Sequence, residues 1–329
     1  MRAVIVRQPG DESVLALGEV PAPLLGPADV RIRVATAAVN RADLLQRQGL
    51  YPPPPGVTDV LGLECAGEVI EIGADVRDVA VDTRVMALLP GGGYAEEVAV
   101  DHGSVMPVPD ALTDEEAAGV PEVFLTAFAN LFLPRLGALQ AGESALVHGG
   151  GGGVGTAAIV LLRETGNPCF VTVGSAEKGR RCEALGASLA LDYTAGDFAD
   201  AVRARTDGRG VDVVLDHVGA TYLEPNLRAL AVGGRLVVIG LMGGGTFAEL
   251  DLGALLLRRQ SVIGSTLRSR PTAEKSDVVR AFLDRFGAAL RAGRLRPPID
   301  AVLPLADVAE AHRRMQASAH FGKIVLRVR

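Results

Sequence analysis

Five consecutive glycines at 149–153 lie between two apolar runs of the chain. The run before them, at 144–148, is typical of a buried strand, and the residues from Val154 onward are typical of an apolar helix. The spacing Gly-x-Gly-x-x-Gly begins at Gly150, where bare backbone lets a pyrophosphate approach the free N–H groups of a helix start. We therefore expect a dinucleotide site formed by Gly150, Gly152, Gly153, Val154 and Gly155.

Two other interpretations of the glycine turn are weaker. A merely flexible linker would not require apolar runs on both of its sides. A Walker loop closes with Gly-Lys-Ser or Gly-Lys-Thr, and this turn has neither sequence. The sequence thus favours nucleotide binding without ATP hydrolysis.

The residues after the next predicted strand indicate which dinucleotide binds. NAD sites place an acidic residue there to hold the ribose 2′-hydroxyl, whereas this chain has Gly-Ser-Ala-Glu-Lys at 174–178. The glycine leaves space, and Ser175, Lys178 and, after the third strand, Tyr193 can donate to a 2′-phosphate. Glu177 is acidic, but an acid in the first turn of a helix needs no ligand to explain it. We predict NADPH rather than NADH.

The pattern of the sequence changes twice along the chain. Short alternating strands broken by Pro and Gly fill the first part, and between 143 and 267 apolar runs alternate with helix-length segments, as in a parallel sheet of six strands. The tail is expected to pack on the first part. This predicts an α/β protein with a β-rich domain at 1–122 and 268–329 and a doubly wound nucleotide-binding domain at 123–267.

The composition excludes several classes of function. The chain holds 39 acidic and 33 basic residues, for a formal net charge of −6, and no long basic block, so we expect neither a nucleic-acid nor a membrane partner. Its three cysteines have no Cys-x-x-Cys spacing, which argues against a disulfide framework or a zinc ribbon. Because the sequence shows no leader and no long apolar segment, a cytoplasmic location is expected.

With these residues in view, the chain resembles the medium-chain dehydrogenase/reductase superfamily over nearly all of its length, and within it the zinc-free quinone oxidoreductases. The segments that carry the likeness look like those of the tumour-suppressor-inducible quinone oxidoreductase subgroup, and they lie at 40–49, 88–93, 121–122, 241–245, 267–270 and 322–326. The resemblance implies that the β-rich domain is a GroES-like catalytic domain and the other a Rossmann domain. It also implies a homodimer joined through the last Rossmann strand.

The metal ligands of zinc-dependent relatives are replaced in this chain. By resemblance, their positions are Asn40, Leu63 and about Glu122, and the first two side chains are poor Zn²⁺ ligands. The five histidines show no paired metal spacing. We therefore expect no metal, and a reaction that polarises its acceptor by hydrogen bonds.

Asn40 and Tyr51 are the candidate donors for that polarisation. In the resembling family, a tyrosine of a Gln-Gly-x-Tyr segment borders the active site, and residues 48–51 retain this segment ahead of four prolines. Asn40 could instead bond its own backbone in a turn, and Tyr51 could simply pack on the prolines. His148 and His217, at the ends of predicted strands, are interpreted as structural.

The resemblance places further residues beside the cofactor. They belong to one helix, two loops and the last predicted strand: Thr126, Gly240, Leu241, Met242, Leu267, Arg268 and Lys323. Helix packing or turn chemistry would also explain each of them. Gly152 stands where some relatives carry serine, so the turn is expected to bind the nucleotide rather than to catalyse.

The leading hypothesis is NADPH-dependent reduction of a quinone or similar α,β-unsaturated carbonyl, with Tyr51 and Asn40 polarising the acceptor oxygen. Two alternatives share every nucleotide motif. One is an enoyl reductase of lipid or polyketide metabolism. The other is an NADPH sensor or RNA-binding protein with little turnover, although the acidic net charge counts against RNA.

Overall fold

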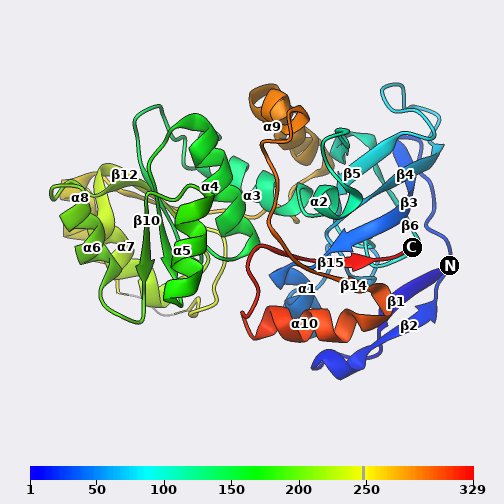
Figure 1. Cartoon of the computed structure of the whole chain (residues 1–329), viewed down its shortest axis with the longest axis horizontal. Coiled ribbons are helices and arrows are strands. Elements are labelled where there is room, and N and C mark those ends of the chain that lie inside the picture. Colours follow the sequence, from blue (N-terminus) through cyan, green and yellow to red (C-terminus); the bar gives the residue numbers. More distant parts are fainter. Residues whose placement is uncertain (247–248) are drawn as a thin grey trace. The chain divides into compact units, whose positions relative to one another are not determined.

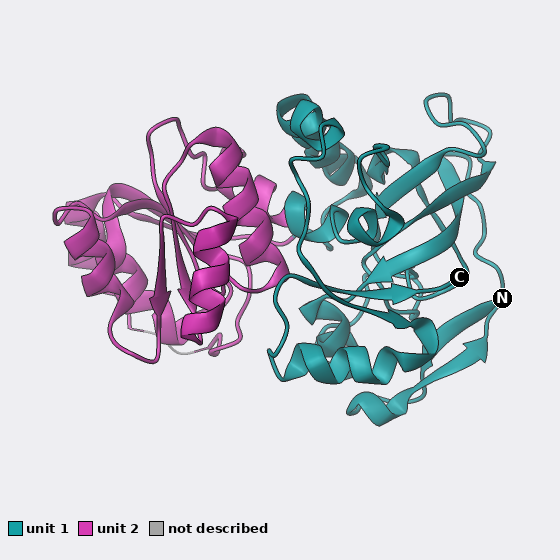
Figure 2. Cartoon of the chain, viewed as in Figure 1, with its two compact units in different colours: residues 1–125, 267–329 teal, residues 126–266 magenta. Residues whose placement is uncertain are grey.

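In a computed structural model the chain forms two compact units (Figure 2). The structure describes residues 1–246 and 249–329. Unit 1 comprises Met1–Leu125 and Leu267–Arg329, and unit 2 comprises Thr126–Thr266. The domain boundaries expected from the sequence, after residues 122 and 267, lie next to these limits.

Unit 1 contains a seven-stranded sheet and a two-stranded one. The strands are β1 (Arg2–Val6), β2 (Leu15–Glu19), β3 (Asp29–Ala38), β4 (Glu64–Ile72), β5 (Arg84–Leu88), β6 (Glu97–Asp101), β7 (Val105–Pro107), β14 (Ile299–Pro304) and β15 (Lys323–Arg327). The larger sheet follows the order β14-β15-β3-β4-β5-β7, with β6 also paired to β3, and β1 pairs with β2. Among the strand pairs of unit 1, β14 and β15 are parallel and the others are antiparallel. The tail of the chain therefore belongs to the sheet of unit 1.

Alternation along β3 explains how the large sheet forms its core. Val30, Ile32 and Val34 are fully buried, whereas Arg31 and Arg33 between them are not. Since successive strand residues point to opposite faces, the valines and the isoleucine share the core face. Leu326 of β15 joins the same core, and each such buried side chain contributes about 1.5–3 kcal/mol.

The helices of unit 1 are α1 (Arg41–Arg47), α2 (Asp114–Ala118), α9 (Thr272–Arg291) and α10 (Val308–Gln316), with short 3₁₀ turns η1 (Glu12–Val14), η2 (His102–Ser104) and η4 (Leu305–Asp307). A further helix, α3 (Pro121–Phe132), contains the boundary between the two units. Asn40 is the N-cap of α1, and its backbone N–H donates to Asp43 Oδ2 at 2.8 Å. This bond replaces an intrahelical partner that the first amides of a helix lack.

Unit 2 contains a six-stranded, fully parallel sheet. Its strands are β8 (Ala145–Val147), β9 (Cys169–Val173), β10 (Leu189–Asp192), β11 (Val211–Asp216), β12 (Leu230–Val238) and β13 (Ser261–Gly264), in the order β10-β9-β8-β11-β12-β13. All six strands were predicted. β12 runs through the glycines at 233 and 234, although glycine weakens a strand interior.

Helices cover both faces of this sheet, with α4 and α5 on one side and α6 and α7 on the other (Figure 1). They are α4 (Gly153–Thr165), α5 (Ala176–Leu185), α6 (Phe198–Arg205), η3 (Ala220–Tyr222), α7 (Leu223–Ala229) and α8 (Leu252–Arg258). The predicted α/β class, with a β-rich unit and a unit built on a parallel sheet, is confirmed. Ligands of such sheets bind at the carboxyl ends of the strands.

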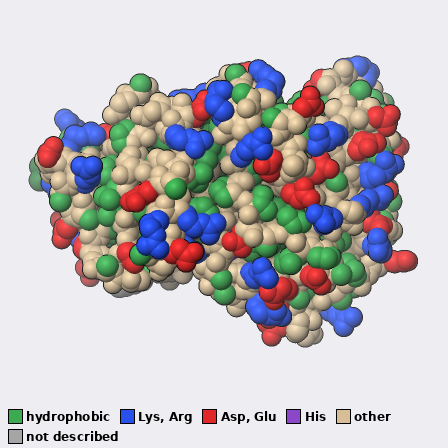
Figure 3. All heavy atoms as spheres, viewed as in Figure 1, with side chains coloured by type: hydrophobic (Ala, Val, Ile, Leu, Met, Phe, Trp, Pro, Cys, Tyr) green, Lys and Arg blue, Asp and Glu red, His purple; other side chains and the backbone are tan. Residues whose placement is uncertain are grey.

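Two surface properties bear on possible partners. No helix among the described residues combines the length and the apolar character needed to cross a membrane. On the face shown in Figure 3, basic and acidic side chains are interspersed within each unit.

Candidate functional site

The glycine turn joins β8 to α4. Gly149 has φ +62°, in the left-handed region that favours glycine. The backbone N–H of Gly150 donates to Thr172 O at 2.8 Å, and that of Gly152 to Gly149 O at 2.9 Å. Gly152 is the N-cap of α4 and offers no side-chain cap, so the first amides of α4 remain available to an anion.

The space around each glycine tests whether a pyrophosphate fits the turn. A Cβ at Gly150 would lie 2.7 Å from Cβ of Val171, and a Cβ at Gly155 would lie 2.7 Å from Cα of Gly150. A Cβ at Gly152 would meet only Gly149 O, at 3.4 Å. Gly150 and Gly155 therefore allow strand and helix to pack, whereas Gly152 faces open space. This is the division of roles that a dinucleotide turn requires.

His148 lies beneath this turn and is fully buried. Its Nδ1 lies 3.0 Å from Thr172 Oγ1 and its Nε2 lies 2.6 Å from Asn226 Oδ1. Burial lowers the pKa of His148 to about 3, so the ring is neutral at physiological pH. Its contacts explain it as a structural residue, as interpreted from the sequence.

The residues predicted to hold a 2′-phosphate lie together after β9 and β10. Ser175 is the N-cap of α5, and its Oγ accepts from Lys178 N at 3.3 Å. A Cβ at Gly174 would lie 2.6 Å from the hydroxyl oxygen of Tyr193, so the phenol is directly beside this glycine. Glu177 is exposed in the first turn of α5.

Two exposed apolar residues, Leu241 and Met242, follow β12 at the same edge of the sheet. The backbone N–H of Met242 donates to His217 O at 3.1 Å, and Gly240 precedes this loop. Thr126 lies on α3, and its carbonyl accepts from Asn130 Nδ2 at 2.8 Å. Nucleotide contacts by these residues stay predictions.

Unit 1 contains a buried ionic cluster formed by Asn40, Glu64 and Lys323. The ammonium of Lys323 donates to Glu64 Oε1 at 2.7 Å, Asn40 Oδ1 at 2.8 Å and Val39 O at 3.0 Å. The Asn40 amide donates to Glu64 Oε1 at 2.9 Å and Ala38 O at 3.3 Å. Lys323 is 1% exposed and Glu64 is fully buried.

These contacts bear on the roles expected for two residues. All three N–H bonds of the Lys323 ammonium have acceptors within the protein, which gives Lys323 a structural role, and a contact between Lys323 and the cofactor stays a prediction. Both N–H bonds of the Asn40 amide are likewise engaged. Asn40 is thus placed to hold the cluster together, and its donation to an acceptor oxygen stays a prediction.

Glu122 borders the ionic cluster. Its backbone N–H donates to Glu64 Oε2 at 2.8 Å. Burial, followed by the charge of Glu64, raises the pKa of Glu122 to about 8. The Glu122 carboxyl is therefore mainly protonated at neutral pH.

Asp43 of α1 forms a second buried polar group. Its Oδ2 accepts from Tyr94 Oη at 3.1 Å and its Oδ1 from Gly62 N at 3.1 Å. Tyr94 and His312 lie edge to face, and burial lowers the pKa of His312 to about 3 while raising that of Asp43 to about 6. These bonds fix α1, and with it Asn40.

Arg268 and Tyr51 are predicted site residues of unit 1 that lie next to each other. Among the predicted site residues that the structure describes in unit 1, Arg268 has a buried side-chain donor without a hydrogen-bond partner. The Arg268 guanidinium lies 5.2 Å from the Tyr51 ring centroid and donates to Pro90 O at 2.8 Å and Gln46 Oε1 at 2.7 Å. Its Nη1 is buried without a hydrogen-bond partner, and the side chain is 5% exposed. Burial also raises the pKa of Tyr51, so its hydroxyl keeps its proton.

Sequence reasoning missed Glu64 and the side chain of Arg268. A signal for Glu64 was present, because a lone carboxylate in the apolar run 61–66 requires a buried partner. Nothing in the sequence tells that Lys323 is that partner. Among the described residues, no three His, Cys, Asp or Glu side chains gather so that they could hold a metal ion.

Comparisons with known families match two parts of the chain. Residues 26–110 match the alcohol dehydrogenase GroES-like domain, and residues 185–326 match the zinc-binding dehydrogenase family. These matches cover parts of both units.

Two curated relatives align with most of the chain. It is 33% identical over 326 residues to a phenolphthiocerol/phthiocerol polyketide synthase of Mycobacterium tuberculosis, with 98% of this chain but only 14% of that protein covered. It is 32% identical over 319 residues to the human synaptic vesicle membrane protein VAT-1 homolog, with 93% and 80% covered. The chain therefore spans about a seventh of the first relative and most of the second.

Solved structures agree with these alignments. A Pseudomonas syringae quinone oxidoreductase superposes with TM-score 0.88 at 29% identity over 99% of each chain. An NAD-dependent alcohol dehydrogenase superposes with a TM-score of 0.84 at 33% identity, with all of both chains covered. A mycobacterial protein complexed with NADPH superposes with a TM-score of 0.85 at 29% identity. The superposition covers 99% of this chain and 100% of that one. From the shared fold and the identity to these relatives, the chain belongs to the medium-chain dehydrogenase/reductase superfamily of oxidoreductases.

Proposed function

We propose that this protein reduces quinones or similar α,β-unsaturated carbonyls with NADPH and without a metal, as expected for the tumour-suppressor-inducible subgroup. NADPH supplies a hydride when bound. The glycine turn would hold its pyrophosphate, and Ser175, Lys178 and Tyr193 would bind its 2′-phosphate. The quinone oxidoreductase and the NADPH complex among the similar structures support this choice.

The observation that carries the proposal is the free donor of Arg268 beside Tyr51. Nη1 of Arg268 and the Tyr51 hydroxyl are the groups that would donate to an acceptor oxygen as negative charge develops on it. Lys323 places an ammonium beside two positions, those of Asn40 and Glu122, where zinc-dependent relatives carry metal ligands. A cation already held there disfavours a second cation.

The proposal is tested by following NADPH consumption with a quinone, an enone and an enoyl thioester. We expect turnover of the quinone and the enone. Arg268→Met and Tyr51→Phe should each lower kcat/KM by about 10²-fold, the effect of removing one oxyanion donor. Arg77→Met is the matched control, because Arg77 also donates to backbone carbonyls in unit 1 but is exposed.

An enoyl reductase is the second candidate, favoured by the alignment of 98% of this chain with the polyketide synthase. Turnover of enoyl thioesters alone would select it over quinone reduction. Tight NADPH binding with no turnover of any acceptor would contradict both and favour a sensor.

We also propose that two copies pair through β13, the edge strand of the unit 2 sheet. Apolar side chains are exposed on β13 and on the preceding helix α8: Leu252, Leu256, Leu257 and Val262. An open strand edge with such neighbours invites pairing with a second chain. Leu257→Glu should give monomers in analytical ultracentrifugation, whereas Leu24→Glu, at a residue 92% exposed in unit 1, should not. A monomeric wild type would contradict the proposal.

A further inference from the structure

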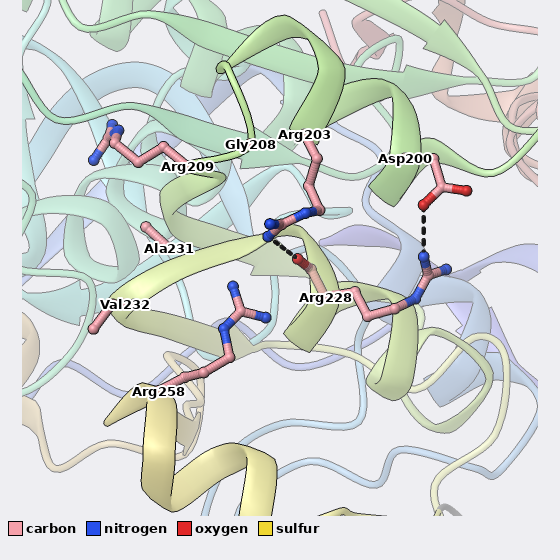
Figure 4. A pocket seen from close by; sticks show the side chains of 8 residues that line it. All are labelled: Asp200, Arg203, Gly208, Arg209, Arg228, Ala231, Val232 and Arg258. Carbon is pink, nitrogen blue, oxygen red and sulfur yellow. Dashed lines mark hydrogen bonds and ion pairs between the residues drawn. The ribbon is translucent and has the colours of Figure 1, made fainter.

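A pocket of unit 2 lies away from the glycine turn. It has a volume of about 730 Å³ and is lined from α6, α7, the residues before β11, the start of β12 and the end of α8 (Figure 4). Because β11 and β12 begin there, the pocket lies at the amino-terminal edge of the parallel sheet. The glycine turn follows the carboxyl end of β8, at the opposite edge. The pocket is thus distinct from the nucleotide site.

Arginine dominates the polar lining of this pocket. Four arginines stand against one acidic side chain: Arg203, Arg209, Arg228, Arg258 and Asp200. Arg209 is neutralised by a bidentate pair with Asp212 at 2.8 Å. Arg228 pairs with three acids, Asp197, Asp200 and Glu224, so this group has one positive and three negative charges.

Arg203 and Arg258 have no carboxylate partner among the described residues. Nη1 of Arg203 donates only to Arg228 O, at 3.3 Å. Arg258 donates to two backbone carbonyls, Leu227 O at 3.0 Å and Leu230 O. Each guanidinium therefore keeps unused N–H groups. In Figure 4 both side chains extend toward the same space.

The two guanidinium groups also act on each other. Burial, together with the positive charge of Arg203, lowers the pKa of Arg258. Neither guanidinium is hydrogen-bonded to a carboxylate of the described residues, so both keep N–H groups for an anion, although the excess negative charge of the acids around Arg228 partly offsets their charge. The planar N–H forks of arginine match the oxygens of a phosphoryl group.

We propose that Arg203 and Arg258 bind the phosphoryl group of a small phosphorylated metabolite in this pocket. The volume lies in the range that binds small ligands and exceeds what one phosphate ion would fill. Val232 and Ala231 supply an apolar wall for the remainder of such a molecule.

The test is calorimetric titration of the full chain with inorganic phosphate and with glycerol phosphate, at constant ionic strength set with chloride. We expect Arg203→Gln and Arg258→Gln each to weaken binding by about tenfold or more, as for loss of a charge-assisted bond. Arg205→Gln, on the same helix and exposed, should bind like the wild type. Arg203→Gln removes only one backbone bond, so it remains informative if Arg258→Gln unfolds.

Tighter binding of glycerol phosphate than of inorganic phosphate would support a metabolite. No binding by the wild type, equal affinities for the two ligands, or unchanged affinity in Arg203→Gln would overturn the proposal. The last result would mean that phosphate binds outside this pocket.

Discussion

The ionic cluster of unit 1 and the glycine turn of unit 2 differ in whether their hydrogen-bond donors have partners within the protein. In the cluster of Asn40, Glu64 and Lys323, every N–H bond of the ammonium and the amide meets an acceptor of the protein. In the turn, Gly152 leaves the first amides of α4 without a side-chain cap. Charge alone therefore does not mark a ligand site. A charged group whose hydrogen bonds are all made within the protein has a structural role, whereas a donor without a partner in the protein is available to a ligand.

The largest effect is expected when the cation of the ionic cluster is removed. Lys323→Met would leave the Glu64 carboxylate buried without its cation and should lower the free energy of unfolding by about 3–5 kcal/mol in urea denaturation. Arg33→Met, which removes an ion pair whose side chains are 44% and 43% exposed, should cost less than about 1 kcal/mol. Equal losses in the two variants would mean that the cluster is not a structural element.

The two kinds of glycine in the turn should respond differently to alanine. Gly155→Ala places a Cβ against the backbone of Gly150 and should destabilise the protein by about 1–3 kcal/mol. Gly152→Ala should change stability by less than about 0.5 kcal/mol, because its Cβ would meet only Gly149 O at 3.4 Å, and it should keep NADPH affinity, since some relatives carry serine at this position. Urea denaturation and fluorescence titration separate the two effects. Equal losses of stability in Gly152→Ala and Gly155→Ala would show that the two glycines do not have different roles.

The pH dependence of stability tests whether Glu122, beside the ionic cluster, keeps its proton in the folded state. Its pKa of about 8 in the folded state lies above the ordinary 4.5, so the folded protein binds this proton more tightly than the unfolded chain does. The wild type should therefore lose stability relative to Glu122→Gln as pH rises from 4.5 to 8. Between pH 5.5 and 7.5 the difference in unfolding free energy should shift by about 2–3 kcal/mol in favour of the variant. A constant difference would show that burial does not retain the proton.

Sequence patterns predicted the turn and the sheet well because both depend on local features. A strand, a glycine run and a helix are adjacent in the chain, and the α/β alternation repeats that unit. The ionic cluster was not predicted, since Lys323 meets Glu64 and Asn40 only through the pairing of β15 with β3 and of β3 with β4. The unused donor of Arg268 likewise depends on contacts with Pro90 and Gln46, which are far away in sequence.

The central claim, that the open turn and the residues after β9 and β10 form an NADPH site, is tested most directly by titrating NADPH and NADH into the wild type and Lys178→Ala. Arg180→Ala, an exposed residue of the same helix, is the control. We predict that Lys178→Ala raises the Kd for NADPH by about tenfold, as expected for loss of one charge-assisted contact, while the Kd for NADH stays unchanged. An equal effect on both nucleotides would contradict the claim.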